Sequence, residues 1–411
     1  KIWKKAEKSI QGILQRLYVI GQRTSWGGEQ MSEEKSYQYW LHNIPEAGDR
    51  TIEKILKEFG SARQAYFAGA DALRPMIRGK GKEKIEGFIK NWDIKKKYEE
   101  LNQKKIQFIS REDDHYPLKL RKLESPPYAL YCLGNLPKEQ MPSAAVIGAR
   151  ECSEYGSSMA RAFAGKLAKA GVSVISGMAR GIDGIAQQTA LEAGGKTYAV
   201  LGSGVDICYP KSNKKLYQEI IETGGGILST FPPGTQPIKR QFPERNRIVA
   251  GLSDLLLVVE ARLKSGTWIT VDMALEQGKS VYAVPGRLTD RLSDGCNFLI
   301  RQGAEIALTP EDILAEFDIL QNRKGMERKS IKCENKESGD KVQMQILELL
   351  DIYPKAVDEI FEAMKIRGSQ MELSELLERL IHLCIEKKAK QTGGSYFSKI
   401  YDSDTIEYIK Q

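Results

Sequence analysis

The stretch SAAVIGARECSEYGSSMARAFAGKLAKAGVSVIS, residues 143–176, decides the fold. Its first six residues form a short apolar run that predicts a buried strand, and its last residues, VSVIS, predict another. Between them lies a segment of helical period, with Ser153 as its expected N-cap and Gly171 as its end. A strand, a helix and a second strand in this order predict a parallel pair joined by a crossover helix.

The same alternation of strand and helix continues over about 170 residues. Together these segments predict an α/β domain with a doubly wound parallel sheet over residues 111–317. Residues 128–133, which alternate weakly, are expected to add an edge strand. The further strands predicted after the opening stretch are KTYAVLG (196–202), GILSTF (226–231), DLLLVVEA (254–261) and KSVYAVPG (279–286).

Two segments precede this domain. Residues 31–110 predict a small helical domain of the SAM or helix-hairpin-helix type. Its turn carries Glu46 and Asp49, which repel phosphate, so we expect a structural module. Residues 1–30 include a basic amphipathic stretch, but MSEEK beginning at Met31 is typical of a natural start. We therefore expect the first thirty residues to lie upstream of the true start.

Two segments also follow it. Residues 318–341 are charged and lack apolar periodicity, which predicts a linker. Residues 342–411 contain three helical segments and a hairpin, which together predict a winged-helix domain. Its third helix carries Glu372, Glu375 and Glu378 against Arg379, and residues 342–402 hold 8 Lys+Arg and 10 Asp+Glu. This balance opposes a phosphate contact and favours a protein-contact or regulatory role.

The bulk composition narrows the function classes. The net charge is +8, from 62 Lys+Arg and 54 Asp+Glu, which mildly favours a polyanionic partner. The six cysteines form no CxxC pair and there are three histidines, so neither a metal site nor a disulfide framework is expected. No apolar run approaches the roughly 20 residues that a membrane span requires. We expect a cytoplasmic protein in a reducing compartment.

Several loops after the predicted strands are suited to binding anions. In an open parallel sheet, ligands bind where the strands end. Gly148, Ala149 and Arg150 follow the first strand, where free backbone N–H groups and an arginine favour an anion. FPPGTQPIKRQFPERNR (231–247) follows the fourth strand, and residues 262–267 follow the fifth. Several such loops at one edge predict a basic binding site.

The stretch QFPERNRIVAGL (241–252) places an aromatic residue and two arginines at the start of a helix. Arg245 and Arg247 lie two positions apart, so their side chains diverge and need not face one phosphate. Either arginine is a candidate to contact a ligand, and either is a candidate to brace the pocket. Phe242 is a candidate for the hydrophobic core and also for stacking on a base.

Reactive groups are scarce in this domain. No histidine lies between His115 and His382. Asp183 is most simply a helix cap, and Cys152 has no base beside it. The dinucleotide and P-loop patterns are both incomplete, because glycines are missing at the required positions. We expect no catalytic residue and no cofactor.

Long motifs resemble the DprA/Smf family of bacterial DNA-processing proteins, from about residue 36 to residue 400. The motifs that carry the resemblance are GAR (148–150), SGMARGIDGIAQQTAL (176–191), GSGVDICYPKSNKKLYQEI (202–220), FPERNRIVAGLSDLLLVVEA (242–261), SGTWITVDMALEQGKSVYAVPG (265–286) and SDGCNFLIRQGA (293–304). The resemblance implies an extended Rossmann domain followed by a winged helix. It also implies that the protein is not an enzyme.

The resemblance further implies a function and a set of partners. Members of the family bind and protect single-stranded DNA, and they load a RecA-type recombinase onto it in natural transformation, helping to displace single-strand-binding protein. They also form homodimers. Matching residues implied to bind DNA are Gly148, Ala149, Arg150, Lys239, Phe242, Arg245, Arg247, Ser265 and Gly266. Those implied at the dimer interface are Asn297, Phe298 and Ile306.

Two other functions remain open at this point. The sheet resembles that of the LOG-type phosphoribohydrolases, which use a PGGxGTxxE loop whose glutamate does the chemistry. Here Gly266 and Thr267 are present, but Lys264 and Ser265 replace two glycines and Thr270 stands at the glutamate position. That difference argues against hydrolysis. A plain protein-interaction scaffold would leave the basic and aromatic residues of the 231–247 loop unexplained.

Overall fold

The computed structural model describes residues 33–323, 341–369, 371–386, 388–392 and 395–400. The predicted N-terminal extension lies outside the described residues, as does most of the predicted linker. Among the residues described, none of the helices has the length and apolar character needed to span a bilayer.

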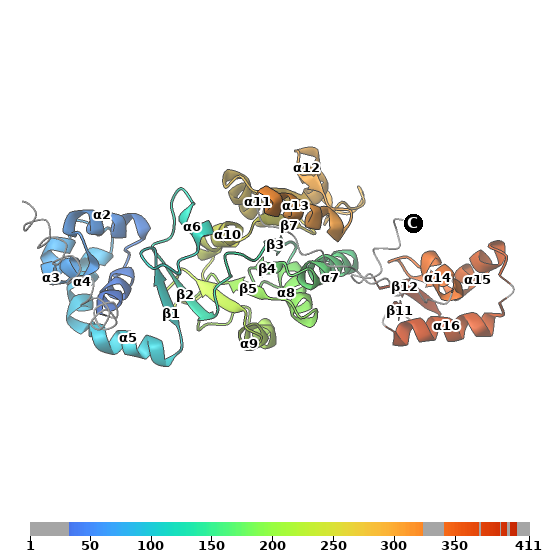
Figure 1. Cartoon of the computed structure of the whole chain (residues 1–411), viewed down its shortest axis with the longest axis horizontal. Coiled ribbons are helices and arrows are strands. Elements are labelled where there is room, and N and C mark those ends of the chain that lie inside the picture. The colour runs from blue at the N-terminus through green and yellow to red at the C-terminus, as the bar shows by residue number, and fades with distance from the viewer. Residues whose placement is uncertain (1–32, 324–340, 370, 387, 393–394, 401–411) are drawn as a thin grey trace, which may run out of the picture.

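A large mixed sheet forms the centre of the molecule (Figure 1). Within the described residues its strand order is β1-β2-β6-β5-β4-β3-β7-β8-β9, and the strands from β6 to β9 in this order run parallel. The six parallel strands predicted from the sequence are confirmed. The strands are β1 Gln107–Ser110, β2 Ala129–Gly134, β3 Ser143–Ile147, β4 Ser173–Ser176, β5 Thr197–Val200, β6 Gly226–Ser229, β7 Leu255–Val258, β8 Val281–Ala283 and β9 Glu305–Ile306.

The expected edge strand at residues 128–133 is not an edge. This strand, β2, pairs antiparallel with both β1 and β6, and β1 takes the outer position. β1 falls inside the range that the sequence assigned to helices. It is four residues long, with only Gln107 exposed, so it is too short to show an alternating pattern.

Helices cover both faces of the parallel strands. On one face, Ala145 and Ile147 of β3 pack with α10, α11 and α12, and on the other, Ala144 and Val146 pack with α7, α8 and α13. Figure 1 shows α10 and α11 on one side of β3–β5, with α8 and α9 on the other. These helices are α7 Glu154–Lys169, α8 Ile182–Glu192, α9 Lys214–Glu222, α10 Gln241–Leu252, α11 Thr267–Glu276, α12 Asp294–Arg301 and α13 Pro310–Arg323.

The predicted ends of the first crossover helix are confirmed. The Ser153 hydroxyl accepts the backbone N–H of Gly156 at 3.0 Å, which caps the N-terminus of α7. Gly171 follows the last turn with φ +80°, a conformation that a side chain would disfavour. At the other end of the domain, α13 runs to Arg323, so residues 318–323 of the predicted linker are helical.

The helical N-terminal region shares its core with the outer strands. Trp40 and Ile52 belong to the same buried cluster as Tyr131 of β2 and Ile227 of β6. Asp49 accepts the backbone N–H of Tyr128 at 3.0 Å, so this turn carboxylate is used to hold the region to the sheet. Residues 33–42 are helical, followed by α2 Asp49–Phe59, α3 Ala62–Leu73, α4 Gly81–Asn91 and α5 Ile94–Gln103.

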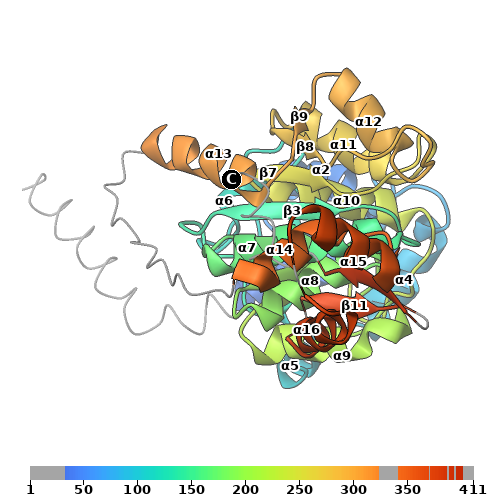
Figure 2. The ribbon, with the colours of Figure 1, turned by 90° about the vertical axis from the view of Figure 1, so that its right-hand side faces the viewer.

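The C-terminal region lies at the opposite end of the molecule from the helical region (Figure 1 and Figure 2). Its three helices and its hairpin follow the predicted order, while its assignment as a winged helix stays a prediction. The Arg287 guanidinium lies 3.7 Å from the ring centre of Tyr353, and Lys390 Nζ lies 3.8 Å from a Glu154 carboxylate oxygen. Its elements are α14 Lys341–Leu349, β10 Lys355–Ala356, α15 Val357–Ile366, α16 Leu373–Ile385, β11 Ala389–Gln391 and β12 Tyr396–Lys399.

A buried histidine joins the helical region to β2. His42 Nδ1 lies 2.9 Å from the Tyr131 hydroxyl, to which Asn43 Nδ2 also donates at 3.1 Å. Burial lowers the pKa of His42 from 6.5 to about 4, because no carboxylate compensates the desolvation of a charged ring.

We expect this histidine to make the fold sensitive to acid. Between pH 6.5 and about 4, His42 binds a proton in the unfolded chain but not in the folded chain. The free energy of unfolding therefore falls as the pH drops through this window, by up to about 3 kcal/mol. Urea unfolding of the wild type and of His42→Gln at pH 7, 5.5 and 4.5 measures the effect. An identical pH dependence in both proteins would contradict this prediction.

Candidate functional site

A pocket of about 620 Å³ opens at the carboxyl ends of the parallel strands. It lies around the end of β3, whose neighbours β4 and β7 are reached by connections that run in opposite directions along the sheet. This reversal is where open α/β sheets bind ligands. Of the residues expected to bind DNA, those that line the pocket are Gly148, Ala149, Arg150, Lys239, Phe242, Arg245, Ser265 and Gly266.

The loop after β3 brings Arg150 to the pocket. At Gly148 a Cβ atom would lie 2.7 Å from Ile182 Cγ1 and 2.8 Å from the Glu260 carbonyl oxygen, so only glycine allows the loop to pass here. Arg150 is exposed, and its guanidinium carbon lies 5.5 Å from the ring centre of Phe242. The loop thus presents a positive charge beside an aromatic ring.

The buried side chain of Glu260 holds this loop in position through hydrogen bonds. Its carboxylate is fully buried at the end of β7 and accepts both the backbone N–H of Ser153, at 2.9 Å, and the Ser153 hydroxyl. A negative charge at this position also favours the N-terminus of α7. Glu260 was not among the predicted site residues, although a carboxylate at the end of an apolar strand was a signal.

Arg245 supports the pocket from the interior. The side chain is buried, and its Nη1 donates to the carbonyl oxygens of Gly177 and Val200, the latter at 2.6 Å. Asp183 compensates the charge and accepts the backbone N–H of Gly177 at 3.1 Å. Burial lowers the pKa of Arg245 to about 10 and raises the pKa of Asp183, each against the effect of the other. Much of the guanidinium is therefore engaged within the protein.

Arg247 does not line the pocket, unlike the other residues expected to bind DNA. It is half-buried, and its charge acts on Asp49 of the helical region. Its Nη2 is buried and has no hydrogen-bond partner among the described residues. Two positions along a helix separate side chains by about 200°, which explains why the paired arginines point to different sides.

The loop after β7, the strand paired with β3, forms another part of the pocket. Arg262 is exposed here and lines the pocket, and its backbone carbonyl accepts Trp268 Nε1–H at 3.1 Å. Ser265 lines the pocket, and its hydroxyl oxygen is buried without a hydrogen-bond partner among the described residues. This loop was predicted to bind an anion, but Arg262 was not among the predicted site residues.

Two aromatic rings, those of Phe242 and Tyr209, also line the pocket. The ring centres of Phe242 and Tyr209 are 5.8 Å apart, with an angle of 34° between the planes. Tyr209 comes from the loop after β5, and it was not among the predicted site residues. Its neighbour in the sequence is Pro210, and its signal was an aromatic residue in a polar loop at the ligand edge.

The pocket is also lined by two carboxylates, Glu151 and Asp183, of which Asp183 compensates the charge of Arg245. Burial, together with Glu260, raises the pKa of Cys152, so its thiolate is disfavoured. Thr270, at the position where the hydrolases carry their glutamate, is buried and has no acidic group. Among the described residues, no group of three or more His, Cys, Asp or Glu side chains is placed to hold a metal ion.

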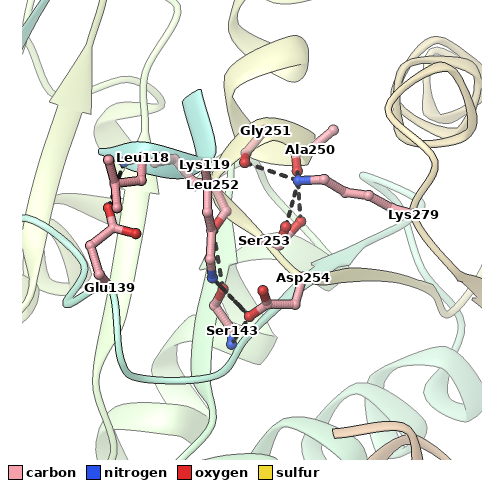
Figure 3. Close-up of polar contacts among 10 residues, drawn as sticks. All are labelled: Leu118, Lys119, Glu139, Ser143, Ala250, Gly251, Leu252, Ser253, Asp254 and Lys279. Carbon is pink, nitrogen blue, oxygen red and sulfur yellow. Dashed lines mark hydrogen bonds and ion pairs between the residues drawn. The ribbon is translucent and has the colours of Figure 1, made fainter. Parts of the chain in front are cut away.

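The far end of α10 is anchored at the opposite edge of the sheet (Figure 3). Lys279 Nζ donates to the carbonyl oxygens of Ala250, Gly251 and Ser253 at the end of this helix. Burial lowers the pKa of Lys279 to about 7. Close by, Lys119 Nζ donates to Asp254 at 2.7 Å. The helix that carries the pocket residues is thus fixed at both ends.

Fold and pocket together define a Rossmann-like protein with a basic, aromatic binding site at the switch point of its sheet. Residues 107–318 match the family model described as DNA recombination-mediator protein A. The chain belongs to this family.

One relative and its solved structure agree with this assignment. The DNA processing protein DprA of Streptococcus pneumoniae is 44% identical over 214 residues, which cover 52% of this chain and 75% of the relative. A crystal structure of that protein aligns with 68% of this chain and 97% of its own, at 35% identity and a TM-score of 0.60. A Helicobacter pylori DprA structure, described for its single-stranded DNA binding mode, is 33% identical and covers 53% of this chain and 97% of its own, with a TM-score of 0.47.

We expect Lys279→Met to destabilise the protein. The change leaves carbonyl oxygens at the end of α10 without their donor, which costs about 2 kcal/mol. Thermal unfolding followed by circular dichroism should show a lower Tm. Lys54→Met, at an exposed position of α2, is the matched control and should unfold like the wild type. Equal Tm values for Lys279→Met and the wild type would contradict the anchoring role.

Proposed function

We propose that the pocket binds single-stranded DNA with little sequence preference. The observation that carries the proposal is that two exposed arginines, Arg150 and Arg262, line one pocket together with the rings of Phe242 and Tyr209. Lys239, exposed in the loop just before α10, adds a third cation. These are the two kinds of group that single strands require: cations along the backbone and flat faces for the bases.

The same geometry favours a single strand over a duplex. A base can stack on a protein ring only when it is free of its own stack, and a duplex keeps its bases inside. Arginine and lysine contacts to phosphate hold the backbone without reading the bases. Binding through such contacts is expected to weaken strongly with salt.

Family membership supports a wider role. We propose that the bound strand is protected and then passed to a RecA-type recombinase in natural transformation or homologous recombination, with single-strand-binding protein as a further possible partner. The described cysteines are free, which suits the reducing conditions of the cytoplasm. We propose that the protein acts there, as a binding protein and not as an enzyme.

We further propose three working units: a helical domain at residues 31–110, a DNA-binding domain at 111–317 and a C-terminal domain at 342–411. For the C-terminal domain we propose a protein-contact or regulatory role. Its α16 carries Glu375 and Glu378, and Arg379 lies 3.2 Å from Glu375, so acidic charge surrounds the arginine of this helix.

A homodimer is also part of the proposal. β9 ends the sheet, and Ile306 on this strand is 47% exposed, with Phe298 of α12 at 38%. Apolar groups at a free sheet edge are typical of an interface. Asn297 has a different use, because its side-chain amide exchanges two hydrogen bonds with the backbone of Gly286 at 3.1 and 3.0 Å. We propose that it shapes the interface from within.

Removing a pocket cation should weaken DNA binding. For Arg150→Ala, Lys239→Ala and Arg262→Ala we expect the affinity for oligo-dT to fall about 3- to 10-fold. Each change should reduce the slope of log affinity against log salt by about 0.7, because one phosphate contact is lost. Fluorescence anisotropy over a salt series measures both quantities. Lys54→Ala serves as the control.

The outcome also separates the proposed function from its rivals. If all three variants keep the wild-type affinity and salt slope, the pocket is not the DNA site. If the wild type fails to bind oligo-dT and instead releases free base from nucleoside monophosphates, the hydrolase alternative is supported. A protein that does neither would favour the interaction scaffold.

A charge at the free sheet edge should separate the dimer. Ile306→Glu places a carboxylate on the proposed apolar interface, where pairing would bury it. Light scattering coupled to size-exclusion chromatography should give the monomer mass for the variant and the dimer mass for the wild type. The exposed Ile366→Glu change in the C-terminal region is the control. A dimeric Ile306→Glu protein would overturn this interface.

A further inference from the structure

Tyr209 lines the pocket and lies in the loop between β5 and the short helix at Lys211–Asn213. The residue is 45% exposed, so part of its ring is accessible from solvent. It lines the same pocket as Arg150 and Lys239.

The loop that carries Tyr209 is held firmly at several points. The Gly204 N–H donates to the Thr235 carbonyl at 2.9 Å, and the Gly234 N–H donates to the Asp206 carboxylate at 2.7 Å. On the inner side, the Tyr217 hydroxyl donates to the Val205 carbonyl at 2.5 Å. An aromatic residue on a loop tied in this way loses little entropy when a ligand binds.

Phe242, the aromatic residue expected to stack on a base, is more closely surrounded by protein groups than Tyr209 is. A Cβ atom on Gly202 would lie 3.0 Å from Phe242 Cδ1, so the backbone covers one edge of this ring. The guanidinium carbons of Arg150 and Arg245 lie 5.5 and 5.9 Å from its centre. Tyr209 is its fourth neighbour. Phe242 is thus surrounded by protein groups, while Tyr209 keeps free surface.

We propose that Tyr209 supplies the face on which an unpaired base stacks, and that Phe242 is a positioning residue for Tyr209 and Arg150. The inference rests on the proposed function, since it assigns a base to the aromatic part of that DNA site. The gap of 5.8 Å between the two ring centres is too short to admit a base between them, because two stacking contacts of about 3.4 Å are needed. The base therefore lies on the outer face of Tyr209.

This arrangement separates two kinds of recognition within one pocket. The cations act on phosphates, whether or not bases are attached, whereas Tyr209 acts only where a base is present. Removing the bases from the DNA should therefore abolish the contribution of Tyr209 and leave that of Arg150. A tyrosine that instead served a protein partner would show no dependence on the bases.

The experiment compares oligo-dT with an abasic oligonucleotide of the same length, by fluorescence anisotropy at fixed salt. We expect Tyr209→Ala to weaken oligo-dT binding about tenfold and to leave abasic binding within about twofold of the wild type. Tyr209→Phe and Tyr209→Trp keep an aromatic face and should keep the affinity for oligo-dT. Phe242→Ala should weaken binding to both ligands, because Arg150 loses its support.

Controls make the outcomes distinct. Tyr396→Ala removes a tyrosine of similar exposure, 49%, from the C-terminal region and should bind both ligands like the wild type. If the wild type binds oligo-dT and Tyr209→Ala binds it equally well, the inference is wrong and the proposed function stands. Equal losses on both ligands would also overturn stacking by Tyr209. If the wild type binds neither ligand, the proposed function is wrong, and so is the role proposed for Tyr209.

Discussion

The buried charge of Arg245 is the constraint on which the pocket depends. A guanidinium inside a protein is tolerated only when its N–H donors and its charge are satisfied. Removing one member of a buried ion pair typically costs about 3–5 kcal/mol, which is on the order of a third of the stability of a domain. Here the carbonyls at the ends of β4 and β5 accept its N–H groups, and Asp183 of α8 balances its charge. One side chain of α10 thereby fixes the relative positions of two strands and two helices at the ligand edge.

Much of the fold could be predicted because its central strands are short apolar runs that are buried on both faces. The outer elements escaped prediction for physical reasons. β1 has four residues and β9 has two, and both residues of β9 are exposed, so neither strand buries enough surface to leave a pattern. α13 continues into the segment expected to be a linker because polar residues such as Gln321 and Arg323 are good helix formers.

The site was predictable to the level of loops and less so to the level of side chains. Parallel strands bring their carboxyl ends together, so Gly148, Arg150 and Ser265 were expected at one edge, and the structure places them there. Helical spacing showed that Arg245 and Arg247 diverge but gave no direction for either, since that depends on how α10 packs. Glu260 and Tyr209 were missed because burial and loop conformation, which determine their roles, are tertiary properties.

The way Arg245 is engaged has a consequence for how variation at this pocket is read. Arg150 and Arg262 are exposed at the surface, where neither charge needs a buried partner, whereas Arg245 and Asp183 compensate each other in the interior. A binding assay alone would not separate the loss of a ligand contact at Arg150 or Arg262 from the loss of the pocket's shape at Arg245, because both weaken binding. Among relatives, we therefore expect Arg245 and Asp183 to be retained or replaced together, whereas Arg150 and Arg262 can be replaced independently of each other.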